Sequence, residues 1–564
     1  MSYPTKPWSG AREALFSAVI FLAVLGLYSL TWFQDIAAGV STIGAERVLR
    51  GEMPYRDFWT MYAPGHFYLL ALLFRIFGSH ILVERIAASV VCAGAGLVCY
   101  WIVLNLVRRR LAAIGVMAIF VAATLNTGYF RNLGTYPPSI FFVLAAINLM
   151  VLHYKTGKLG YVIAAGLTTG AAAVFKHDVG GYTAIAIVAG LIGHHFAFPQ
   201  IKGDRRRALV AKLSLYGSGL ALIVLPVAAY FAVLARWDVL QDVIIFPLTD
   251  FRFSRGEHYP SIFEFDIYGR SFLNSVSMLF GYIKFTLPFL LLVFGLIGVA
   301  LAVRKRKPEY VAPGVMFSVA YLFHYAAAHV QINTHIISMS IYAALLGVVF
   351  FDWVDREFGV GRFPMTKLMS WAVVGVWFLS LAAKPVEEVW TDRKKLTAEL
   401  KLPKVSGQRV SPQLKSFLSE LLPYVDANIS RNEPVFVGMH RHDVVITGAN
   451  HSLYFMLDRP IATRYNELHP AIVDTAAVQR EMIRDLQKEN VALLILYRRF
   501  PDEVLDKVKR GFLKNLPQVG ATDLDRFIRA NYVQIRAIGK HAIWKRKDRI
   551  AEGNIGESTH WKDS

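Results

Sequence analysis

The sequence predicts an all-α bundle of about eleven membrane-spanning helices followed by a small α/β soluble domain. The chain has 564 residues, 55% of them hydrophobic, and its mean hydropathy is +0.40. Several runs of about 18 to 26 residues are nearly free of charge, which is enough to cross a hydrocarbon core of ~30 Å. After residue 384 the charge density becomes ordinary and short β-like runs appear. We therefore expect a transmembrane domain over residues 1–384 and an α/β domain over residues 385–564.

Apolar periodicity places the elements in order along the chain. The expected spans are residues 13–33, 82–107, 111–128, 136–154, 159–175, 180–198, 209–235, 278–303, 310–328, 335–352 and 366–384. The segment 64–77 is too short to cross comfortably and carries Arg75, so we expect it to lie along the membrane interface. Further on, we expect strands at residues 434–438, 492–497 and 532–536 and a helix over residues 472–489.

Clusters of Lys and Arg alternate with nearly neutral loops between the spans. The clusters lie at residues 108–110, 155–158, 202–207, 304–307 and 356–362. The intervening loops at 129–135, 176–179 and 329–334 hold one, one and no Lys or Arg. Because cytoplasmic loops carry the excess of positive charge, we expect a cytoplasmic N-terminus. The loop 34–81 and residues 385–564 then lie on the outer side.

The net charge of +20 fits these basic loops and contact with anionic lipids. A nucleic-acid partner is not expected, because the basic residues form short clusters between apolar spans. No small-residue cleavage site follows the first apolar run, which predicts an uncleaved helix rather than a signal peptide. Cys92 and Cys99 lie in one span, roughly 10 Å apart along a helix. They cannot form a disulfide at that separation, so we expect both to be buried as small apolar side chains.

Two acids in the loop 34–81 are candidates for chemistry. Asp35 lies where the first helix meets the outer interface, and Asp57 lies in the segment Pro54-Tyr-Arg-Asp57. Each has a structural alternative. A carboxylate at a helix end is often solvated or capping, and Asp57 can pair with Arg56 or Arg50.

A second group of ionisable residues lies between two apolar spans with almost no loop. Lys176, His177 and Asp178 follow one another there. Ionisable groups at membrane depth cost free energy and point to function. The alternative is that Lys176 extends to the interface to place its ammonium group in water.

Other outer loops add cationic and histidine side chains. Arg131 either anchors lipid headgroups or faces the site. Arg255 and His258 lie in a loop of about forty residues between two spans, and such a length is typical of an ordered lid. His329 and His335 lie in a short connection, but no third ligand has a recognisable spacing, so no metal is expected. The sequence also contains no Walker A, G-x-S-x-G, H-E-x-x-H or paired C-x-x-C pattern.

The loop 34–81 resembles the first outer loop of the GT-C class of membrane glycosyltransferases, which includes protein O-mannosyltransferases and bacterial aminoarabinose transferases. In those families an acid follows the first helix, and turns and interfacial helices follow in a fixed order. The segments that carry the resemblance are Val48-Leu-Arg-Gly51, Pro54-Tyr-Arg-Asp57, Pro64-Gly65, Phe77-Gly78 and Arg85. In the tail, Val435-Phe-Val-Gly438, Leu453-Tyr-Phe-Met-Leu457 and Arg459-Pro-Ile-Ala-Thr-Arg-Tyr465 resemble bacterial members. Many relatives carry Asp-Glu where this chain has Asp35-Ile36.

The resemblance implies an inverting transfer of a sugar from a polyprenyl-phosphate-linked donor to an envelope acceptor, on the outer face of a bacterial inner membrane. Asp35 would be the general base, with Asp57 positioning the acceptor or the surroundings of Asp35. The donor phosphate would meet Lys176, Arg131, Arg255 and His258, with Arg56, His177 and Asp178 in support. No cofactor is implied. The acceptor stays open among glycolipids, including lipopolysaccharide, polysaccharides and proteins, as do the donor sugar and the oligomeric state.

Two other functions fit part of the pattern. A transporter or flippase for a lipid-linked saccharide would explain the number of spans, but it predicts paired inverted halves and ionisable groups near the bilayer midplane. The sequence shows no such symmetry. A scaffold without catalytic activity, whose outer domain binds envelope partners, is the third interpretation.

Overall fold

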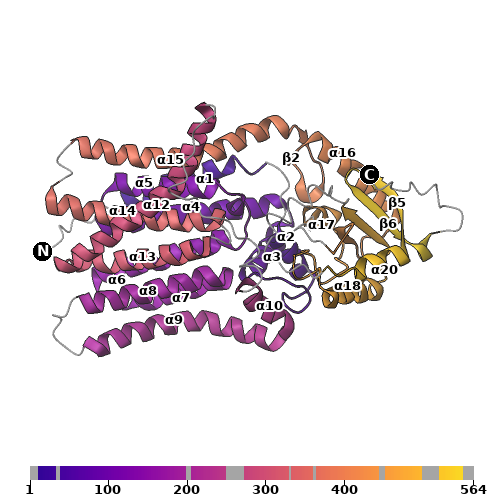
Figure 1. Ribbon diagram of the computed structural model, residues 1–564, viewed down its shortest axis with the longest axis horizontal. Helices are drawn as coiled ribbons and strands as arrows, with labels where there is room; N and C mark the ends of the chain where they lie inside the picture. The colour runs from indigo at the N-terminus through magenta and orange to yellow at the C-terminus, as the bar shows by residue number, and fades with distance from the viewer. Residues whose placement is uncertain are drawn as a thin grey trace.

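The computed structural model describes residues 10–33, 39–197, 205–248, 272–328, 332–359, 364–443, 451–497 and 520–550. Three candidate residues, Asp35, Arg255 and His258, lie outside these ranges. A bundle of long helices forms one end of the molecule and a smaller region with a β-sheet forms the other (Figure 1). The C-terminal part of the chain makes up the sheet region, and we call the end of the bundle opposite to it the far end.

Each of the eleven expected spans coincides with a helix of the bundle. These helices are α1 (Gly10–Ser29), α4 (Ile81–Val107), α5 (Arg110–Leu125), α6 (Tyr136–Thr156), α7 (Gly160–Phe175), α8 (His177–Ala197), α9 (Arg205–Leu234), α12 (Phe272–Arg304), α13 (Pro308–Ala328), α14 (Ile332–Phe358) and α15 (Pro364–Lys395). Within the described ranges, seven helices are long and apolar enough to cross a membrane, and α5 and α7 are shorter apolar helices. The predicted polytopic bundle is therefore confirmed.

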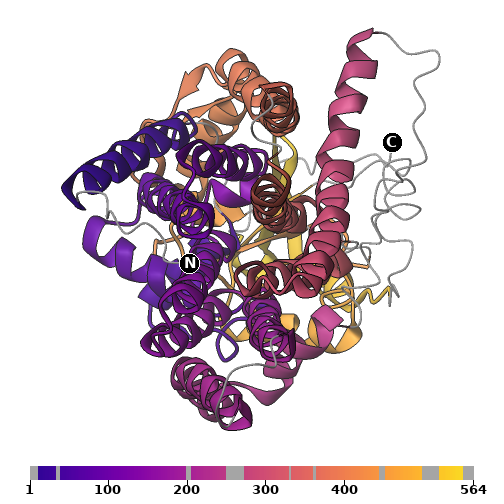
Figure 2. The same cartoon turned by 90° about the vertical axis from the view of Figure 1, so that its left-hand side faces the viewer.

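The helices pack side by side, and most of them appear nearly end-on when the bundle is viewed from its far end (Figure 2). Helix α4 contacts α1, α5 and α6, while α13 contacts α8 and α14. Helices α7 and α9 approach closely because glycines face the contact: a Cβ on Gly166 would lie 2.1 Å from the carbonyl oxygen of Tyr216. Small residues allow this kind of backbone approach between membrane helices. Helix α1 lies at the edge of the bundle and exposes apolar side chains, with Leu15 68% exposed.

Three short helices lie between the bundle and the sheet region (Figure 1). They are α2 (Val40–Leu49), α3 (Gly65–Phe77) and α10 (Trp237–Leu248). Helix α3 has 13 residues and buries one apolar face, including Phe67 and Leu70. It packs on α2, where Gly44 faces the ring of Phe67. The segment 64–77 is thus a short helix beside the spans rather than one of them.

The C-terminal part combines a sheet with flanking helices. The sheet has the order β3-β4-β6-β5, in which β3 and β4 are parallel and the other neighbours are antiparallel. A separate two-stranded sheet precedes it. The elements are β1 (Ala398–Glu399), β2 (Arg409–Val410), α16 (Pro412–Asn428), β3 (Phe436–Met439), α17 (His451–Leu457), α18 (Ala476–Lys488), β4 (Leu493–Tyr497), α20 (Asp523–Asn531), β5 (Tyr532–Ile538) and β6 (His541–Arg546).

The expected strands coincide with β3, β4 and β5, and the expected helix coincides with α18. Strand β6 was not expected, since only three apolar residues precede its charged end. Helix α15 runs without a break past residue 384 to Lys395. The predicted division of the chain into two domains at that residue stays a prediction.

Candidate active site

The candidate residues that the structure describes lie at the end of the bundle that faces the sheet region, which we call the loop end. Asp57, Lys176 and Arg131 all belong to connections at this end. The far end carries the basic clusters expected in the cytoplasm, and acids partner them there: Arg109 pairs with Asp352 and Asp355, and Lys305 pairs with Glu357. These basic residues of the far end are therefore held in ion pairs, and the predicted side of the membrane stays a prediction.

The segment that contains Asp35 is fastened on its N-terminal side by Arg85 of α4. The Arg85 Nη1 donates to the carbonyl oxygen of Trp32 at 2.7 Å and to Gln408 Oε1 at 2.6 Å. The backbone N–H of Arg409 donates to the carbonyl oxygen of Phe33 at 3.0 Å. The chain is thus held between the bundle and the β1–β2 connection two residues before Asp35.

The C-terminal side of the same segment is fastened by Glu84, the neighbour of Arg85. The hydroxyl of Thr42 donates to Glu84 Oε2 at 2.7 Å and accepts the backbone N–H of Gly39 at 3.1 Å. Glu84 is fully buried. Two consecutive residues of α4 therefore hold both flanks of residues 34–38, and we call Glu84 and Arg85 the clamp.

Asp57 closes a tight turn. Its Oδ2 accepts the backbone N–H of Met53 at 2.8 Å and pairs with Arg56 Nη2 at 2.7 Å. Partial burial alone would raise the pKa of Asp57, but Arg56, the Met53 N–H and the nearby Arg47 together lower it below its ordinary value. Asp57 is therefore a carboxylate at neutral pH, and the pairing with Arg56 raised as a structural alternative is present.

Lys176 lies directly at the end of α7, beside the start of α3. A Cβ on Gly65 would lie 2.8 Å from the carbonyl oxygen of Val174, so the two helices touch at this point. The Lys176 Nζ pairs with Asp178 Oδ2 at 2.9 Å and lies 4.7 Å from the centre of the Tyr136 ring. The sequence placed Lys176 and Asp178 in one group, and the structure brings their charged atoms together beside the loop.

Arg131 and a lysine that sequence reasoning missed lie on another side of the loop end. Arg131 pairs with Glu388 of α15. Lys284 of α12 donates to Asn126 Oδ1 at 2.7 Å, just after α5. Its position inside an apolar span was a signal that could have identified it, because charged groups within spans are costly and tend to be functional.

Two histidines also meet in the bundle near Lys176. His324 Nδ1 and His335 Nδ1 lie 3.1 Å apart, and both side chains are buried. His335 and Lys176 both act electrostatically on Asp178. Among the described residues no three His, Cys, Asp or Glu side chains gather as metal ligands would. His329, raised as a partner of His335, lies outside the described ranges.

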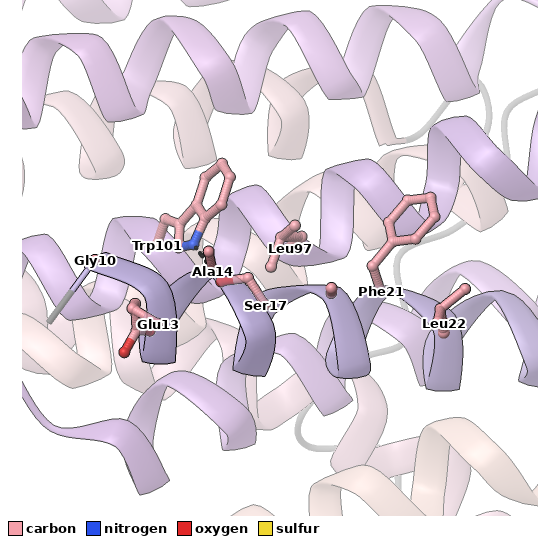
Figure 3. Close-up of a pocket in the computed structure, with 9 residues that line it drawn as sticks. Gly10, Glu13, Ala14, Ser17, Phe21, Leu22, Leu97 and Trp101 are labelled. Atoms are coloured by element: carbon pink, nitrogen blue, oxygen red, sulfur yellow. Dashed lines mark hydrogen bonds between the residues drawn. The ribbon is translucent and has the colours of Figure 1, made fainter. Parts of the chain in front are cut away.

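A groove on the side of the bundle is not part of this group. It lies between α1 and α4 and is lined mostly by apolar residues, with Glu13 at one end (Figure 3). The Glu13 carboxylate pairs with Arg110 at 2.6 Å and accepts the hydroxyl of Tyr100 at 3.1 Å. The groove begins at Gly10, at the opposite end of α1 from Trp32, so it does not reach the loop end.

Comparison with known proteins gives one family match and several similar structures. Residues 62–231 match the family described as Dolichyl-phosphate-mannose-protein mannosyltransferase. The structure is also similar to the crystal structure of ArnT from Cupriavidus metallidurans bound to undecaprenyl phosphate. That match has a TM-score of 0.53 at 11% identity and covers 96% of this chain and 99% of that chain. The fold is that of the GT-C membrane glycosyltransferases.

Two further solved structures are similar to this chain. The apo state of the same ArnT gives a TM-score of 0.51 at 13% identity over 94% of this chain and 98% of that chain. The arabinofuranosyltransferase AftD from Mycobacteria gives 0.48 at 11% identity and covers 94% of this chain and 40% of that chain. No curated protein matches the chain by sequence. The expected GT-C fold is thus confirmed, and the chain is a multi-pass membrane protein.

Proposed function

We propose that this GT-C protein is an inverting glycosyltransferase that moves a sugar from a polyprenyl-phosphate-linked donor to an envelope acceptor. The observation that carries the proposal is the fold shared along nearly the whole chain with ArnT, a protein crystallised with undecaprenyl phosphate. The family match over residues 62–231 supports it and includes Arg131 and Lys176. The gathering of ionisable side chains at the loop end agrees with chemistry at a membrane interface.

The proposed chemistry needs a base and a site for the phosphate. Asp35 removes the proton of the acceptor hydroxyl, and the oxygen attacks the anomeric carbon from the face opposite the phosphate, which inverts the configuration. Asp57 positions the acceptor or the surroundings of Asp35, supported by Arg56. The polyprenyl phosphate leaves as a stable anion, so the chemistry does not itself call for a metal ion.

Cationic side chains stabilise the phosphate as it leaves. We assign this role first to Lys176, then to Arg131, Arg255 and His258. The Lys176–Asp178 pair is the best supported of these assignments because Lys176 lies beside α3. Asp178 holds the ammonium group in place at 2.9 Å, and His177 adds a second side chain at the same junction.

The proposal includes the side of the membrane. The basic clusters lie at the far end of the bundle, so the positive-inside rule puts the loop end and residues 385–564 on the periplasmic side of a bacterial inner membrane. A donor carried on a polyprenol fits this placement, because it is anchored in the membrane and can be used at the outer face without a soluble nucleotide sugar. The α/β part would then act as a periplasmic domain.

Mass spectrometry of envelope glycolipids from cells with and without the chain tests the proposal. We expect a glycolipid mass that differs by one sugar residue, which would identify the sugar and the acceptor class together. Cells expressing Asp35→Asn should resemble cells without the chain, because the amide cannot accept the proton. The variant should reach the membrane in wild-type amounts, as measured by quantitative immunoblot.

Two outcomes would contradict the assignments separately. Unchanged envelope glycolipids, polysaccharides and glycoproteins in cells without the chain would count against sugar transfer. Full product formation by Asp35→Asn would leave sugar transfer standing and remove Asp35 as the base. In cells without the chain, accumulation of an unmodified lipid-linked saccharide on one side of the membrane would instead favour a transporter for that saccharide.

A further inference from the structure

We infer that Arg47 is a positioning residue through which the C-terminal part of the chain holds the Asp57 turn in place. The Asp57 turn is residues 53–58. Its partner is residues 459–466, which we call the docking segment. The inference rests on the proposed function, because the experiment that tests it measures sugar transfer. It adds a role for the C-terminal region in that reaction.

Arg47 joins the two segments through one guanidinium. Its Nη2 donates to the carbonyl oxygen of Asp57 at 3.0 Å. Its Nη1 donates to the carbonyl oxygen of Thr463 at 3.2 Å and to Asn466 Oδ1 at 3.1 Å. Its Nε pairs with Glu52 Oε2 at 2.6 Å. Every nitrogen of the side chain therefore has a partner on the turn, on the docking segment or on Glu52, which directly precedes the turn.

The site is built for an arginine in particular. Arg47 is only 3% exposed, and the carbon of its guanidinium lies 4.9 Å from the centre of the Phe58 ring. A buried charge is tolerated only when it is paired and fully hydrogen-bonded. The planar fork reaches several acceptors at fixed angles, whereas a lysine offers one nitrogen on a flexible stem. Lysine at this position keeps the charge but cannot bridge the turn and the docking segment in the same way.

Further bonds connect the same two segments. The backbone N–H of Trp59 donates to the carbonyl oxygen of Arg464 at 3.1 Å. Arg464 and Arg236 both pair with Glu481 of α18, and the N–H of Arg236 donates to the carbonyl oxygen of Tyr55 at 3.0 Å. The turn that carries Asp57 is therefore held by contacts with the C-terminal part and with Arg236, and Arg47 bonds the carbonyl oxygen of Asp57 directly.

Arg50, the residue that directly follows α2, offers a control. Its Nη1 donates to the carbonyl oxygen of Arg459 at 2.7 Å, and its Nη2 lies 3.8 Å from Glu46 and 3.7 Å from Asp458. It thus joins α2 to the docking segment. Within the described residues, none of these bonds of its side chain reaches the Asp57 turn. Arg50 variants therefore weaken the contact between α2 and the docking segment, whereas Arg47 variants also affect the Asp57 turn.

The experiment compares Arg47→Lys with Arg50→Lys in the full-length chain. Product is measured as modified glycolipid per amount of folded chain in membranes. Undecaprenyl phosphate serves as the probe for donor binding, through the rise in melting temperature that it gives the purified protein. We expect Arg47→Lys to lower product formation at least tenfold while keeping the wild-type rise. Arg50→Lys should stay within threefold of wild type in both measurements.

Asn466 gives a second, milder pair of variants in case Arg47→Lys does not fold. Asn466→Ala removes one acceptor of Arg47 and should lower product formation, whereas Asn466→Asp keeps the acceptor and should restore it. Equal losses in Arg47→Lys and Arg50→Lys would overturn the inference, as would loss of the response to undecaprenyl phosphate in Arg47→Lys. Absence of product from the wild-type chain would instead overturn the proposed function.

Discussion

At the scale of single residues, Asp485 shows how a half-buried acid of the C-terminal region is held by a neighbouring segment. Asp485 of α18 accepts the backbone N–H of Arg464 at 3.1 Å. Burial raises the pKa of Asp485 to about 6, and the nearby Glu481 adds to the rise. Its carboxyl group therefore titrates within a pH range in which the protein can be studied.

The pH dependence of stability follows from this raised pKa. The folded chain binds the Asp485 proton more tightly than the unfolded chain does, so this contribution to stability is complete below about pH 4 and is lost as the pH rises through about 6. Asp485→Asn stays neutral and should raise the free energy of unfolding at pH 7.5 by roughly 1 kcal/mol, after allowance for partial solvent exposure. Melting temperatures of the full-length protein between pH 4 and pH 8 measure the gain. A gain of equal size at pH 4 would contradict the explanation.

The sequence identified some site residues and could not identify others. Lys176 stood out because it lies in a short connection between two apolar runs, and Asp57 because it is one of the acids in the loop 34–81. Arg47 did not stand out, because its acceptors on Thr463 and Asn466 lie 416 and 419 residues further along the chain. The same holds for Glu84, whose role depends on a hydroxyl on another helix. The assignments to Asp35, Arg255 and His258 stay predictions, since these residues lie outside the described ranges.

At the scale of elements, the contact between α2 and α3 sets how the loop lies on the bundle. A Cβ on Gly44 would lie 2.2 Å from Cδ1 of Phe67, whose ring is fully buried. Another contact, between Gly65 and the end of α7, ties α3 to the helix that leads into Lys176. Glycine is required at both positions by close approach rather than by backbone conformation.

Gly44→Ala should separate α2 from α3. Because the Phe67 ring has no room to move, we expect a loss of roughly 1–3 kcal/mol in the free energy of unfolding, as for other overpacked sites. The apparent melting temperature of the purified chain measures it. Gly26→Ala in α1 is the control, since a Cβ there meets no atom within 4 Å and alanine favours a helix. Partial recovery in Gly44→Ala combined with Phe67→Leu would support the contact, and an unchanged Gly44→Ala would contradict it.

The elements differ in how well the sequence predicted them, for a physical reason. A membrane span needs about twenty apolar residues, so the signal is long and hard to miss. Strand β6 has six residues, of which the last are charged, and it forms through pairing with β4 and β5. Such a strand depends on neighbours that a local pattern does not contain. The C-terminal region was accordingly predicted in class but not in topology.

At the scale of the whole molecule, the distribution of charge along the bundle axis sets the expected orientation. Basic clusters occupy the far end, and the sheet region caps the loop end (Figure 1). The two cysteines of the chain, Cys92 and Cys99, are both buried, as expected. An introduced cysteine can therefore report on either end without a background signal from the native thiols.

Labelling of single introduced cysteines tests the orientation. The substitutions are Lys540→Cys, in the β5–β6 turn of the sheet region, and Arg108→Cys, directly after α4 at the far end. Both positions are exposed. A membrane-impermeant maleimide added to spheroplasts should label Lys540→Cys, while Arg108→Cys should react only after the membrane is opened. The reverse pattern would place the sheet region in the cytoplasm and would contradict the proposed periplasmic chemistry.

The clamp has a consequence for how this protein can vary. Glu84 and Arg85 are neighbours on one helix. Arg85 holds the carbonyl oxygen of Trp32, and Glu84 holds Gly39 through the hydroxyl of Thr42, so the two anchor points lie at a set separation. The stretch of chain that joins these two anchor points must fit that separation. Loss of Arg85 would free a bond before this stretch, and loss of Glu84 would free the bond after it. Variation at either position therefore changes how one end of the stretch is held and leaves the bonds at the other end in place.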